Sequence, residues 1–493
     1  MAQQELRPPE SFAVPLIIMD AMIRNLIILC LVLVPSTLKA QAPNIIFFLT
    51  DDQRDDFLGC YGHKILKTPN IDRLAKQGVL FRNAFVTTSI CAASRASIFT
   101  GTYERTHKYT FRMPPIRSAL IRGSYPATLR RAGYRVGFVG KFGVSVRRPD
   151  RARMFDFFAP LNRGPYFKKQ ADGRSRHVTE IAGDEAIRFL RTSPRNQPFC
   201  LSVSFNASHA EDRDKKNHFP WPRAMNGRYE NAKIPPPRLA DQAIYESQPD
   251  FLKKSLNRER WFWRWDTPEK YQLNIRGYYR MISGIDRVIG RVLDENRRLG
   301  NASNTVVIYS ADNGYYAGSR GFAGKWSHYE ESLRVPMIVY DPRLPKNKRG
   351  RAFEQKVLNI DIPATIVDIA LEKKATNYQG KSFAWAVRDT QTPPADWRKD
   401  FFCEHLMQVG ARIPKYEGVR GERWVYARYF EQKPVYEFLH DLKTDPKQLK
   451  NYAKSPGHKV ILDKMRKRCD ELRDANGGKF SRAKFPIAGR RRR

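Results

Sequence analysis

The sequence predicts an α/β fold built on a large, mainly parallel sheet that helices cover on both sides. Short apolar runs rich in strand-forming residues recur along the chain, which is typical of strands buried on both faces. Helical patterns lie between these runs, and this alternation favours parallel strands. The length of 493 residues permits two or three domains, or one large domain with an appendage.

The first elements of the chain show these patterns clearly. Residues 44–50, NIIFFLT, are predicted to form the first buried strand. Residues 68–78 are predicted to form a helix, because Thr68 can cap it, Pro69 suits its first turn and Gly78 can end it. Further buried strands are predicted at residues 134–140, 199–205, 305–310 and 336–340.

The clearest helical pattern lies in residues 271–300, where an apolar stripe recurs at helical spacing. The region between His209 and this helix is long, polar and rich in tryptophan. Loops of that length inside a compact domain are usually functional or disordered, so we expect a substrate-facing insertion. From about Trp397, shorter strand-like pieces predict a small second domain of the α+β type.

The N-terminal region is typical of a secretory signal. Residues 26–34 form an apolar run, and Ala40 and Ala42 have the spacing of a cleavage site. Residues 1–42 are therefore predicted to be a signal region, with translation starting at Met22, and the mature chain is expected in the periplasm or outside the cell. An uncleaved anchor is the alternative, but the run is short for a membrane span, so no stable membrane insertion is expected after cleavage.

The cysteine count singles out one thiol. Export would remove Cys30 and leave an odd number of cysteines. In an oxidising compartment, a cysteine that is left without a disulfide partner is reactive or modified. Among the five that remain, Cys91 stands at the start of a predicted helix. The five are Cys60, Cys91, Cys200, Cys403 and Cys469.

The formal net charge of +38 implies attraction to polyanions such as nucleic acid, an acidic membrane surface or acidic polysaccharide. Lysine and arginine are spread along the whole chain, with a compact run only at residues 490–493. Residues 475–493 are predicted to form a disordered basic tail. No recognised nucleic-acid-binding motif accompanies the charge, so nucleic acid is not an expected partner.

Acidic and amide side chains follow two of the predicted strands. Asp51 and Asp52 come directly after the first strand, and Asp312 and Asn313 follow the strand near residue 310. In open α/β sheets ligands bind beyond the carboxyl ends of the strands, so these side chains are expected to converge. The three carboxylates would repel one another without a cation, and oxygen ligands suit Ca²⁺ or Mg²⁺. The alternative is that each pair only caps the turn after its strand.

The stretch CAASRASIFTG, residues 91–101, predicts a helix whose N-terminus can hold an anion beside Cys91, with Arg95 one turn away to clamp it. This stretch resembles the signature C-x-P-S-R-x-x-x-L-T-G of the type I sulfatases, which belong to the alkaline phosphatase superfamily. The resemblance extends in order and spacing over most of the chain and implies an alkaline phosphatase-like fold. It includes NIIFFLTDDQ, TPNIDRLAKQGVLFRNAFV, ADNGYYAG, GKWSHYEESLRVPMIVYDP, NIDIPATIVDIA and EFLHDLKTDPKQLKNYA.

The resemblance implies that a maturation enzyme oxidises Cys91 to formylglycine. One hydroxyl of the hydrated aldehyde would attack sulfur and expel the alcohol, and the second would lose its proton so that sulfate is released. The resemblance also implies one bound Ca²⁺, with ligands from Asp51, Asp52, Cys91, Asp312 and Asn313.

Further residues are implied as contacts of the sulfate ester. Arg95 and Lys141 would hold the diol and its developing negative charge. Lys325 would bind the sulfate and its bridging oxygen, and His209 would contact the bridging oxygen and protonate the leaving alcohol. Lys141, His209 and Lys325 are thus the expected substrate-binding residues, although each taken alone is an ordinary loop or surface residue.

Two positions depart from the family pattern. Gly143 stands where many sulfatases have a histidine, two places after the lysine equivalent to Lys141, and that histidine is usually credited with helping the eliminating step. His107 and His328 lie in motif-bearing segments and are candidates to replace it. Ala93 stands where the signature usually has proline, a variant that some maturation enzymes accept.

The sequence therefore predicts an exported, calcium-dependent sulfuric ester hydrolase that acts on a sulfated carbohydrate. Its catalytic domain is expected at residues 43–395 and a C-terminal subdomain at residues 396–474. The tryptophans of the insertion can stack on sugar rings, although tryptophans are more often in the core. The alternatives are a phosphate or phosphonate monoester hydrolase of the same superfamily, and a catalytically impaired homologue that only binds polyanions.

Overall fold

The computed structural model describes residues 42–214, 216–373, 376–388, 390–407 and 412–484. The predicted signal region, apart from Ala42, and residues 485–493 of the predicted basic tail lie outside these ranges. Every helix within them is too short or too polar to cross a membrane.

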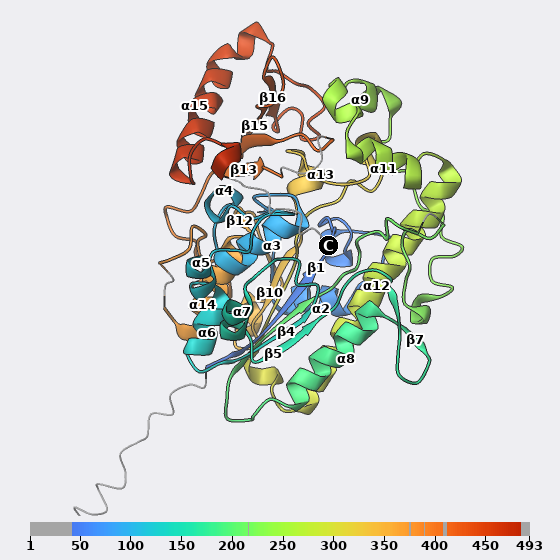
Figure 1. Cartoon of the computed structure of the whole chain (residues 1–493), viewed down its shortest axis with the longest axis vertical. Helices are drawn as coiled ribbons and strands as arrows, with labels where there is room; N and C mark the ends of the chain where they lie inside the picture. Colours follow the sequence, from blue (N-terminus) through green and yellow to red (C-terminus); the bar gives the residue numbers. More distant parts are fainter. Residues whose placement is uncertain (1–41, 215, 374–375, 389, 408–411, 485–493) are drawn as a thin grey trace, which may run out of the picture. The chain divides into compact units, whose positions relative to one another are not determined.

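An eight-stranded sheet forms the centre of the fold and confirms the predicted fold class (Figure 1). In spatial order its strands are β11 (Arg351–Phe353), β2 (Val79–Phe81), β10 (Met337–Tyr340), β9 (Thr305–Ala311), β1 (Asn44–Thr50), β8 (Phe199–Ser204), β4 (Arg135–Gly140) and β5 (Phe157–Pro160). Neighbouring strands are parallel except at β10, which runs antiparallel to both β9 and β2. The strand predicted at residues 336–340 is therefore present, but it is reversed relative to the others.

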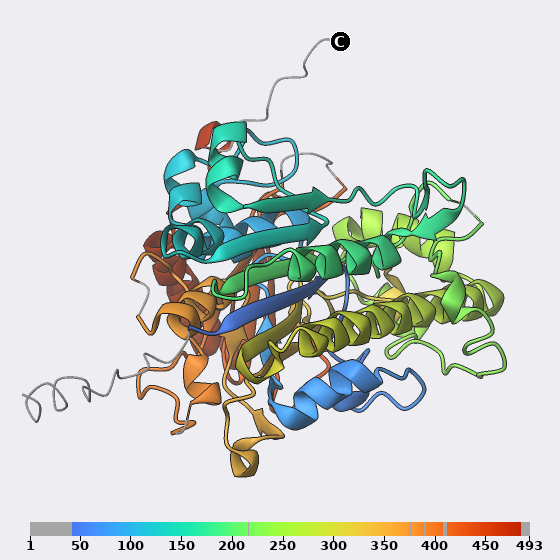
Figure 2. The same ribbon diagram turned by 90° about the horizontal axis from the view of Figure 1, so that it is seen from below.

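Helices cover both faces of the sheet (Figures 1 and 2). One face carries α2 (Pro69–Gln77), α8 (Val178–Arg191) and α12 (Pro268–Arg298). The other carries α3 (Cys91–Thr100), α5 (Ser118–Arg122), α6 (Tyr125–Arg131), α7 (Arg148–Met154) and α14 (Asp361–Leu371). The helices predicted at residues 68–78 and 271–300 correspond to α2 and α12. The Thr68 hydroxyl does not cap α2, however, because it donates to the Asp72 carboxylate at 2.9 Å.

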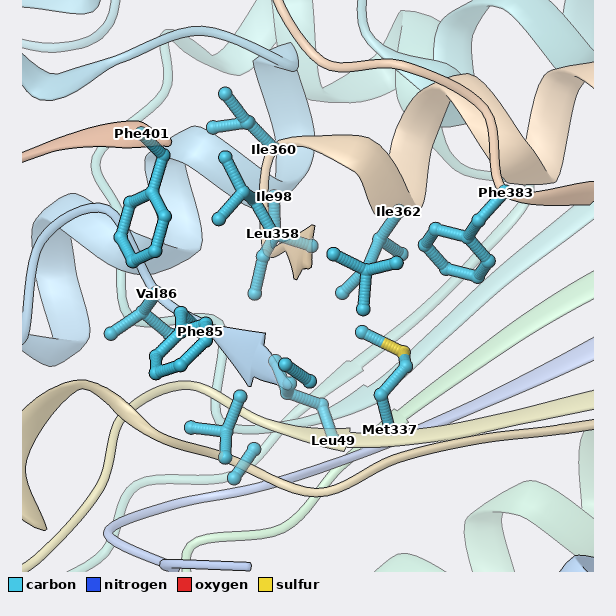
Figure 3. Packing of buried hydrophobic residues seen from close by; sticks show 14 of the residues in the cluster. Leu49, Phe85, Val86, Ile98, Met337, Leu358, Ile360, Ile362, Phe383 and Phe401 are labelled. Atoms are coloured by element: carbon cyan, nitrogen blue, oxygen red, sulfur yellow. The ribbon is translucent and has the colours of Figure 1, made fainter. Parts of the chain in front are cut away.

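The strand β1 is buried on both faces because its alternate side chains enter two separate apolar clusters. Ile45, Phe47 and Leu49 belong to the cluster under α3 and α14, and Ile46 and Phe48 belong to the cluster under α8 and α12. Figure 3 shows part of the first cluster, in which side chains of the sheet, of α3 and of α14 meet. This double burial explains why the first strand has no polar residue between Ile45 and Leu49.

The remaining elements are short or belong to the C-terminal region. Short helices are α4 (Glu104–His107), α9 (Gln242–Glu246), α10 (Asp250–Lys253), α11 (Leu256–Arg264) and α13 (Glu330–Leu333). Two short strand pairs are β3 (Ala84–Phe85) with β12 (Val357–Leu358) and β6 (Phe167–Lys169) with β7 (Ser175–His177). A four-stranded antiparallel sheet contains β13 (Phe401–His405), β14 (Tyr416–Arg420), β15 (Trp424–Tyr429) and β16 (Tyr436–Asp441), and α15 (Lys459–Ala475) packs on it.

Arg105 joins the helical layer to this second sheet. Its Nε donates to Glu404 Oε2 at 2.9 Å on β13, and its Nη2 donates to Glu417 Oε2 at 2.7 Å on β14. All three side chains are buried. The C-terminal sheet is therefore attached to the larger part of the fold through a buried ionic contact, and the boundary predicted at residues 395 and 396 stays a prediction.

We expect Arg105→Met to lower the free energy of unfolding by about 3 kcal/mol, because removing one partner of a buried ion pair leaves an uncompensated charge. Urea denaturation measures the change. Arg297→Met is the matched control, since Arg297 pairs with Asp294 on an exposed part of α12 and should cost no more than about 0.5 kcal/mol. Equal losses in the two variants would show that the buried contact is unimportant.

Candidate active site

The four acidic and amide residues predicted to converge do so at the carboxyl ends of β1 and β9. These strands are parallel and in register, with Thr50 opposite Ala311, so the residues that follow them meet. The Asp52 amide donates to Asp312 Oδ1 at 3.3 Å, and Asn313 Nδ2 donates to Asp52 Oδ1 at 2.7 Å. All of these side chains are buried.

Cys91 begins α3 and lies against this acidic group. Its Sγ is 3.2 Å from Asp51 Oδ1 and 4.0 Å from Asp52 Oδ1. Every residue of α3 is buried, and Gly101 ends the helix with a left-handed conformation. Burial, reinforced by Asp51, raises the pKa of the Cys91 thiol to about 12, so the unmodified residue is a neutral thiol.

Three cationic side chains compensate the carboxylates. The Lys141 ammonium donates to Asp51, and the Lys325 ammonium donates to Asp52. Lys325 Nζ also lies 3.1 Å from Cys91 Sγ. Burial alone would raise the pKa of Asp51, but the positive charges of Lys141, Lys325 and Arg95 hold it well below its usual range.

Arg95 compensates the third carboxylate. Its Nε donates to Asp312 Oδ2 at 2.7 Å, and its Nη1 donates to the Lys141 carbonyl at 2.6 Å and to the Ser204 hydroxyl. Burial and the nearby Asp51 nevertheless raise the pKa of Asp312 to about 6. The Arg95 side chain is therefore held by residues at the carboxyl ends of β8 and β9 and by the loop that follows β4.

His209 lies on the other side of Asp52. Its Nε2 is 3.6 Å from Asp52 Oδ2, and its Nδ1 is 2.7 Å from the Ala210 carbonyl. Arg163 Nη1 contacts the same ring, at 2.9 Å from Nε2. Burial and the Arg163 charge lower the pKa of His209 to about 3, so the imidazole is neutral in this environment.

The donor set fits a divalent metal ion. Asp51, Asp52, Cys91 and His209 each offer a ligand atom, and these atoms lie within 4.8 Å of one another. Within the described residues, Asn313 Oδ1 is buried and accepts no hydrogen bond. An oxygen-rich group of this kind suits a hard cation. His209 belongs to this group although it was not an expected ligand, whereas both Asp312 oxygens accept hydrogen bonds from the chain itself.

A cavity of about 870 Å³ opens beside these residues. Cys91, Lys141, His209 and Lys325 all line it, as the resemblance implied for a substrate site. Leu256 and Arg260 of α11 also line the cavity, so part of the region expected to be a substrate-facing insertion does reach it.

The structure does not support the expectation that the tryptophans of this insertion stack on a sugar ring in the cavity. Trp221, Trp261, Trp263 and Trp265 are all absent from the cavity lining. Trp265 is buried in the core, and Trp221 and Trp261 pack against the same cluster. The tryptophan that lines the cavity is Trp326, next to Lys325.

The two histidines proposed to replace the one missing at Gly143 do not line the cavity. His107 Nε2 lies 3.1 Å from Ser97 Oγ, and His328 packs between Tyr429 and His440 near the C-terminal sheet. Both therefore have structural contacts elsewhere, and His209 is the one histidine among the lining residues.

The backbone at Gly143 explains why no side chain stands there. Its φ is +72°, a conformation that favours glycine, and a Cβ at this position would lie 2.5 Å from Arg95 Cδ. The aliphatic part of Arg95 thus occupies the space that a side chain at residue 143 would need.

Sequence analysis missed Arg163 and Asp212, which lie beside His209. Arg163 contacts the imidazole, and Asp212 forms ion pairs with Arg163, Arg260 and Arg264. No motif marks these residues, and the one sign was that Asp212 follows His209 by three positions.

Known proteins match this chain along most of its length. The Sulfatase family model matches residues 43–372, and a model described as N-sulphoglucosamine sulphohydrolase, C-terminal, matches residues 318–475. The chain is 26% identical to the N-acetylglucosamine-6-O-sulfatase of Bacteroides thetaiotaomicron, over 85% of this chain and 84% of that protein. It is also 26% identical to an arylsulfatase of Clostridium perfringens, over 86% of this chain and 93% of that protein.

A solved structure shares the fold. It is that of a protein in complex with its substrate D-glucosamine-2-N,6-O-disulfate, and its TM-score with this chain is 0.76 at 23% sequence identity. The similarity covers 88% of this chain and 98% of the other. It therefore includes the central sheet and most of the elements around it.

We expect Gly143→Ala to be more destabilising than Gly133→Ala. Both glycines have positive φ, but a Cβ at residue 133 meets nothing within 4 Å, whereas one at residue 143 overlaps Arg95. The two substitutions share a conformational cost of about 1–2 kcal/mol, and Gly143→Ala should add roughly 1–3 kcal/mol for overpacking. Urea denaturation compares them, and equal losses would contradict the proposed conflict with Arg95.

Proposed function

The chain belongs to the sulfatase family and is a type I sulfatase, and we propose that it removes sulfate from a sulfated carbohydrate through formylglycine made from Cys91 and a bound Ca²⁺. The observation that carries this proposal is the position of Cys91, between Asp51 and Lys325 on the wall of the cavity. A residue at this position touches the candidate metal ligands and the substrate space at once.

The bound groups would supply the reactive chemistry. Ca²⁺ would offset the carboxylate charge and polarise the sulfate ester, and the hydrated aldehyde at residue 91 would supply the attacking oxygen. The proposed Ca²⁺ ligands are Asp51, Asp52, residue 91, Asp312 and Asn313. His209, whose ring lies near Asp52, is proposed to act on substrate instead of on the metal.

The chain's own side chains would bind and orient the ester. Lys325 Nζ lies 3.1 Å from the Cys91 sulfur, so it reaches the place where a sulfate oxygen would approach that atom. Lys141 is partly exposed in the cavity and can bind a second oxygen, while Arg95 is held from behind by Asp312. His209 lines the same cavity and would contact the bridging oxygen. It would protonate the leaving alcohol once the negative charge of the bound sulfate ester raises the pKa of the imidazole, which the surrounding residues lower to about 3.

The carbohydrate substrate is supported by the relatives and by charge. The N-acetylglucosamine-6-O-sulfatase and the protein solved with a disulfated glucosamine both take sulfated sugars, as their names state. A formal net charge of +38 favours a polyanionic substrate. Export through the signal region and conversion of Cys91 by a maturation enzyme are parts of the same proposal.

Cys91→Ala should abolish sulfate ester hydrolysis while leaving the fold intact, because it removes the precursor of the attacking group. Turnover of an aryl sulfate and thermal unfolding are the two measurements, and mass spectrometry of the peptide around residue 91 reports the conversion. Cys60→Ser is the matched control, since Cys60 is a free cysteine that is not among the residues lining the cavity. Undiminished activity of Cys91→Ala would rule out residue 91 as the source of the nucleophile. If the unsubstituted protein hydrolyses aryl phosphate or phosphonate esters faster than aryl sulfate, the alternative hydrolases are favoured.

Removal of Ca²⁺ by a chelator should reduce activity and lower the melting temperature. A ligand that binds only the folded state, present at 100 times its Kd, stabilises that state by about 2.7 kcal/mol. Calcium titration followed by thermal unfolding measures this effect in the unsubstituted protein. Asp52→Asn should lose the rise in melting temperature that calcium causes. Asp294→Asn, on the exposed part of α12, should keep this rise. If calcium raises the melting temperature of Asp52→Asn as much as that of the unsubstituted protein, the ion binds elsewhere.

A further inference from the structure

One wall of the cavity carries a cluster of guanidinium groups next to His209. Arg260 Nη2 donates to Asp212 Oδ2 at 3.0 Å, and Arg163 Nη2 lies 3.5 Å from the same oxygen. Arg264, which is buried, donates to the other oxygen of Asp212. Three positive charges therefore meet one carboxylate.

The charges of this wall do not balance. Arg213 also lines the cavity, its side chain is exposed, and it forms no ion pair within the described ranges. The further carboxylate among the lining residues is Glu211, and its Oε2 is buried and accepts no hydrogen bond from described residues. Four arginines thus stand against two carboxylates, which leaves an excess of two positive charges.

The group around Cys91 differs in this respect. Its three carboxylates are matched by three cationic side chains that each donate to one of them. They are Asp51, Asp52 and Asp312, paired with Lys141, Lys325 and Arg95 respectively. Arg151 also lines the cavity and forms no ion pair with a described residue, so the unmatched cationic side chains of the cavity are Arg151 and the excess of two on the wall beyond His209. The proposed Ca²⁺ would add its charge beside Cys91, where the sulfate to be removed would lie.

The excess of positive charge leaves the guanidinium of Arg260 incompletely paired. Its Nε is buried and has no acceptor in the described part of the chain, and burial lowers the pKa of its guanidinium. Its guanidinium carbon lies 5.0 Å from the centroid of the Trp326 ring. Because a buried, incompletely paired charge is unfavourable, an incoming anion would be stabilised here.

We propose that Arg163, Arg213 and Arg260 form an arginine subsite that binds a second oxyanion of the substrate, a carboxylate or a further sulfate, which is held but not cleaved. The inference rests on the proposed function, since the sulfate to be removed would lie beside Cys91 in the same cavity. Guanidinium groups bind either oxyanion through paired hydrogen bonds. The preferred substrate unit is then at least dianionic.

The same cavity has an apolar side that suits the carbon skeleton between the two anions. Its side chains pack together as one cluster, which contains Ile90, Leu256, Trp326, Met407 and Ile413. Ligand cavities commonly combine such an apolar lining with a few polar groups that fix orientation. The apolar side would hold the ring while the lysines and the arginine subsite hold the anions.

Calorimetric binding to Cys91→Ala protein, which cannot turn over its ligand, tests the subsite. The ligands are a monosulfated hexosamine, the same sugar with a second sulfate, and a monosulfated disaccharide that contains a uronate. We expect at least one dianionic ligand to bind about tenfold more tightly than the monosulfated sugar, a difference of about 1.4 kcal/mol. Arg213→Gln and Arg260→Gln, each added to Cys91→Ala, should lose that advantage.

Arg297→Gln is the charge-matched control, because it removes one exposed arginine of α12 that does not line the cavity. Equal binding of all three ligands, or an equal loss in the control, would overturn the subsite. A preference for only the disulfated sugar or only the uronate ligand supports the subsite and identifies the anion. Arg213 is exposed, so Arg213→Gln decides the question even if thermal unfolding shows that Arg260→Gln does not fold.

Turnover of an aryl sulfate by the protein with its natural Cys91 tests the proposed function separately. If no ester is cleaved, the proposed function fails, while the difference in binding between the ligands still decides whether the subsite exists. If the ester is cleaved but the ligands bind equally, the function stands and the subsite is refuted.

Discussion

The structure depends on the compensation of three carboxylates that the sheet brings together away from water. Parallel pairing of β1 and β9 places Asp51, Asp52 and Asp312 at one edge, and an uncompensated buried charge costs several kcal/mol. The cations that offset them come from separate parts of the fold. Arg95 comes from α3, Lys141 from the loop after β4, and Lys325 from the loop before α13. The site and the fold therefore require each other, because displacing any of these elements would leave a buried carboxylate unpaired.

Much of this arrangement could be predicted from the sequence, for physical reasons that differ between its parts. Residues 44–50 and 305–310 are recognisable because strands buried on both faces must be apolar throughout. The residues around Cys91 are recognisable because several motifs occur in the expected order. The reversed direction of β10 was not predictable, since an apolar run of five residues looks the same in either orientation.

The contacts missed by sequence analysis are those made only in three dimensions. Arg163 is 46 residues from His209 in sequence and reaches it from a loop without periodic pattern. The tryptophans of the insertion illustrate the opposite error, because composition alone does not distinguish a ring in the core from one on a cavity wall. Gly143 could be recognised as unusual from the sequence, but its cause, the path of the Arg95 side chain, is visible only in the structure.

The buried contact of Arg105 has a consequence for biosynthesis. The arginine and its acceptor Glu404 are 299 residues apart, so α4 leaves the ribosome long before β13 exists. At 5–20 residues per second this interval lasts roughly 15–60 s. Because α4 also contacts α3 through His107 and Ser97, the helical layer that contains α3 acquires its full set of contacts only after β13 has been made. The proposed maturation enzyme would thus meet Cys91 in a chain that still lacks its last strands, at a residue that is buried in the finished molecule.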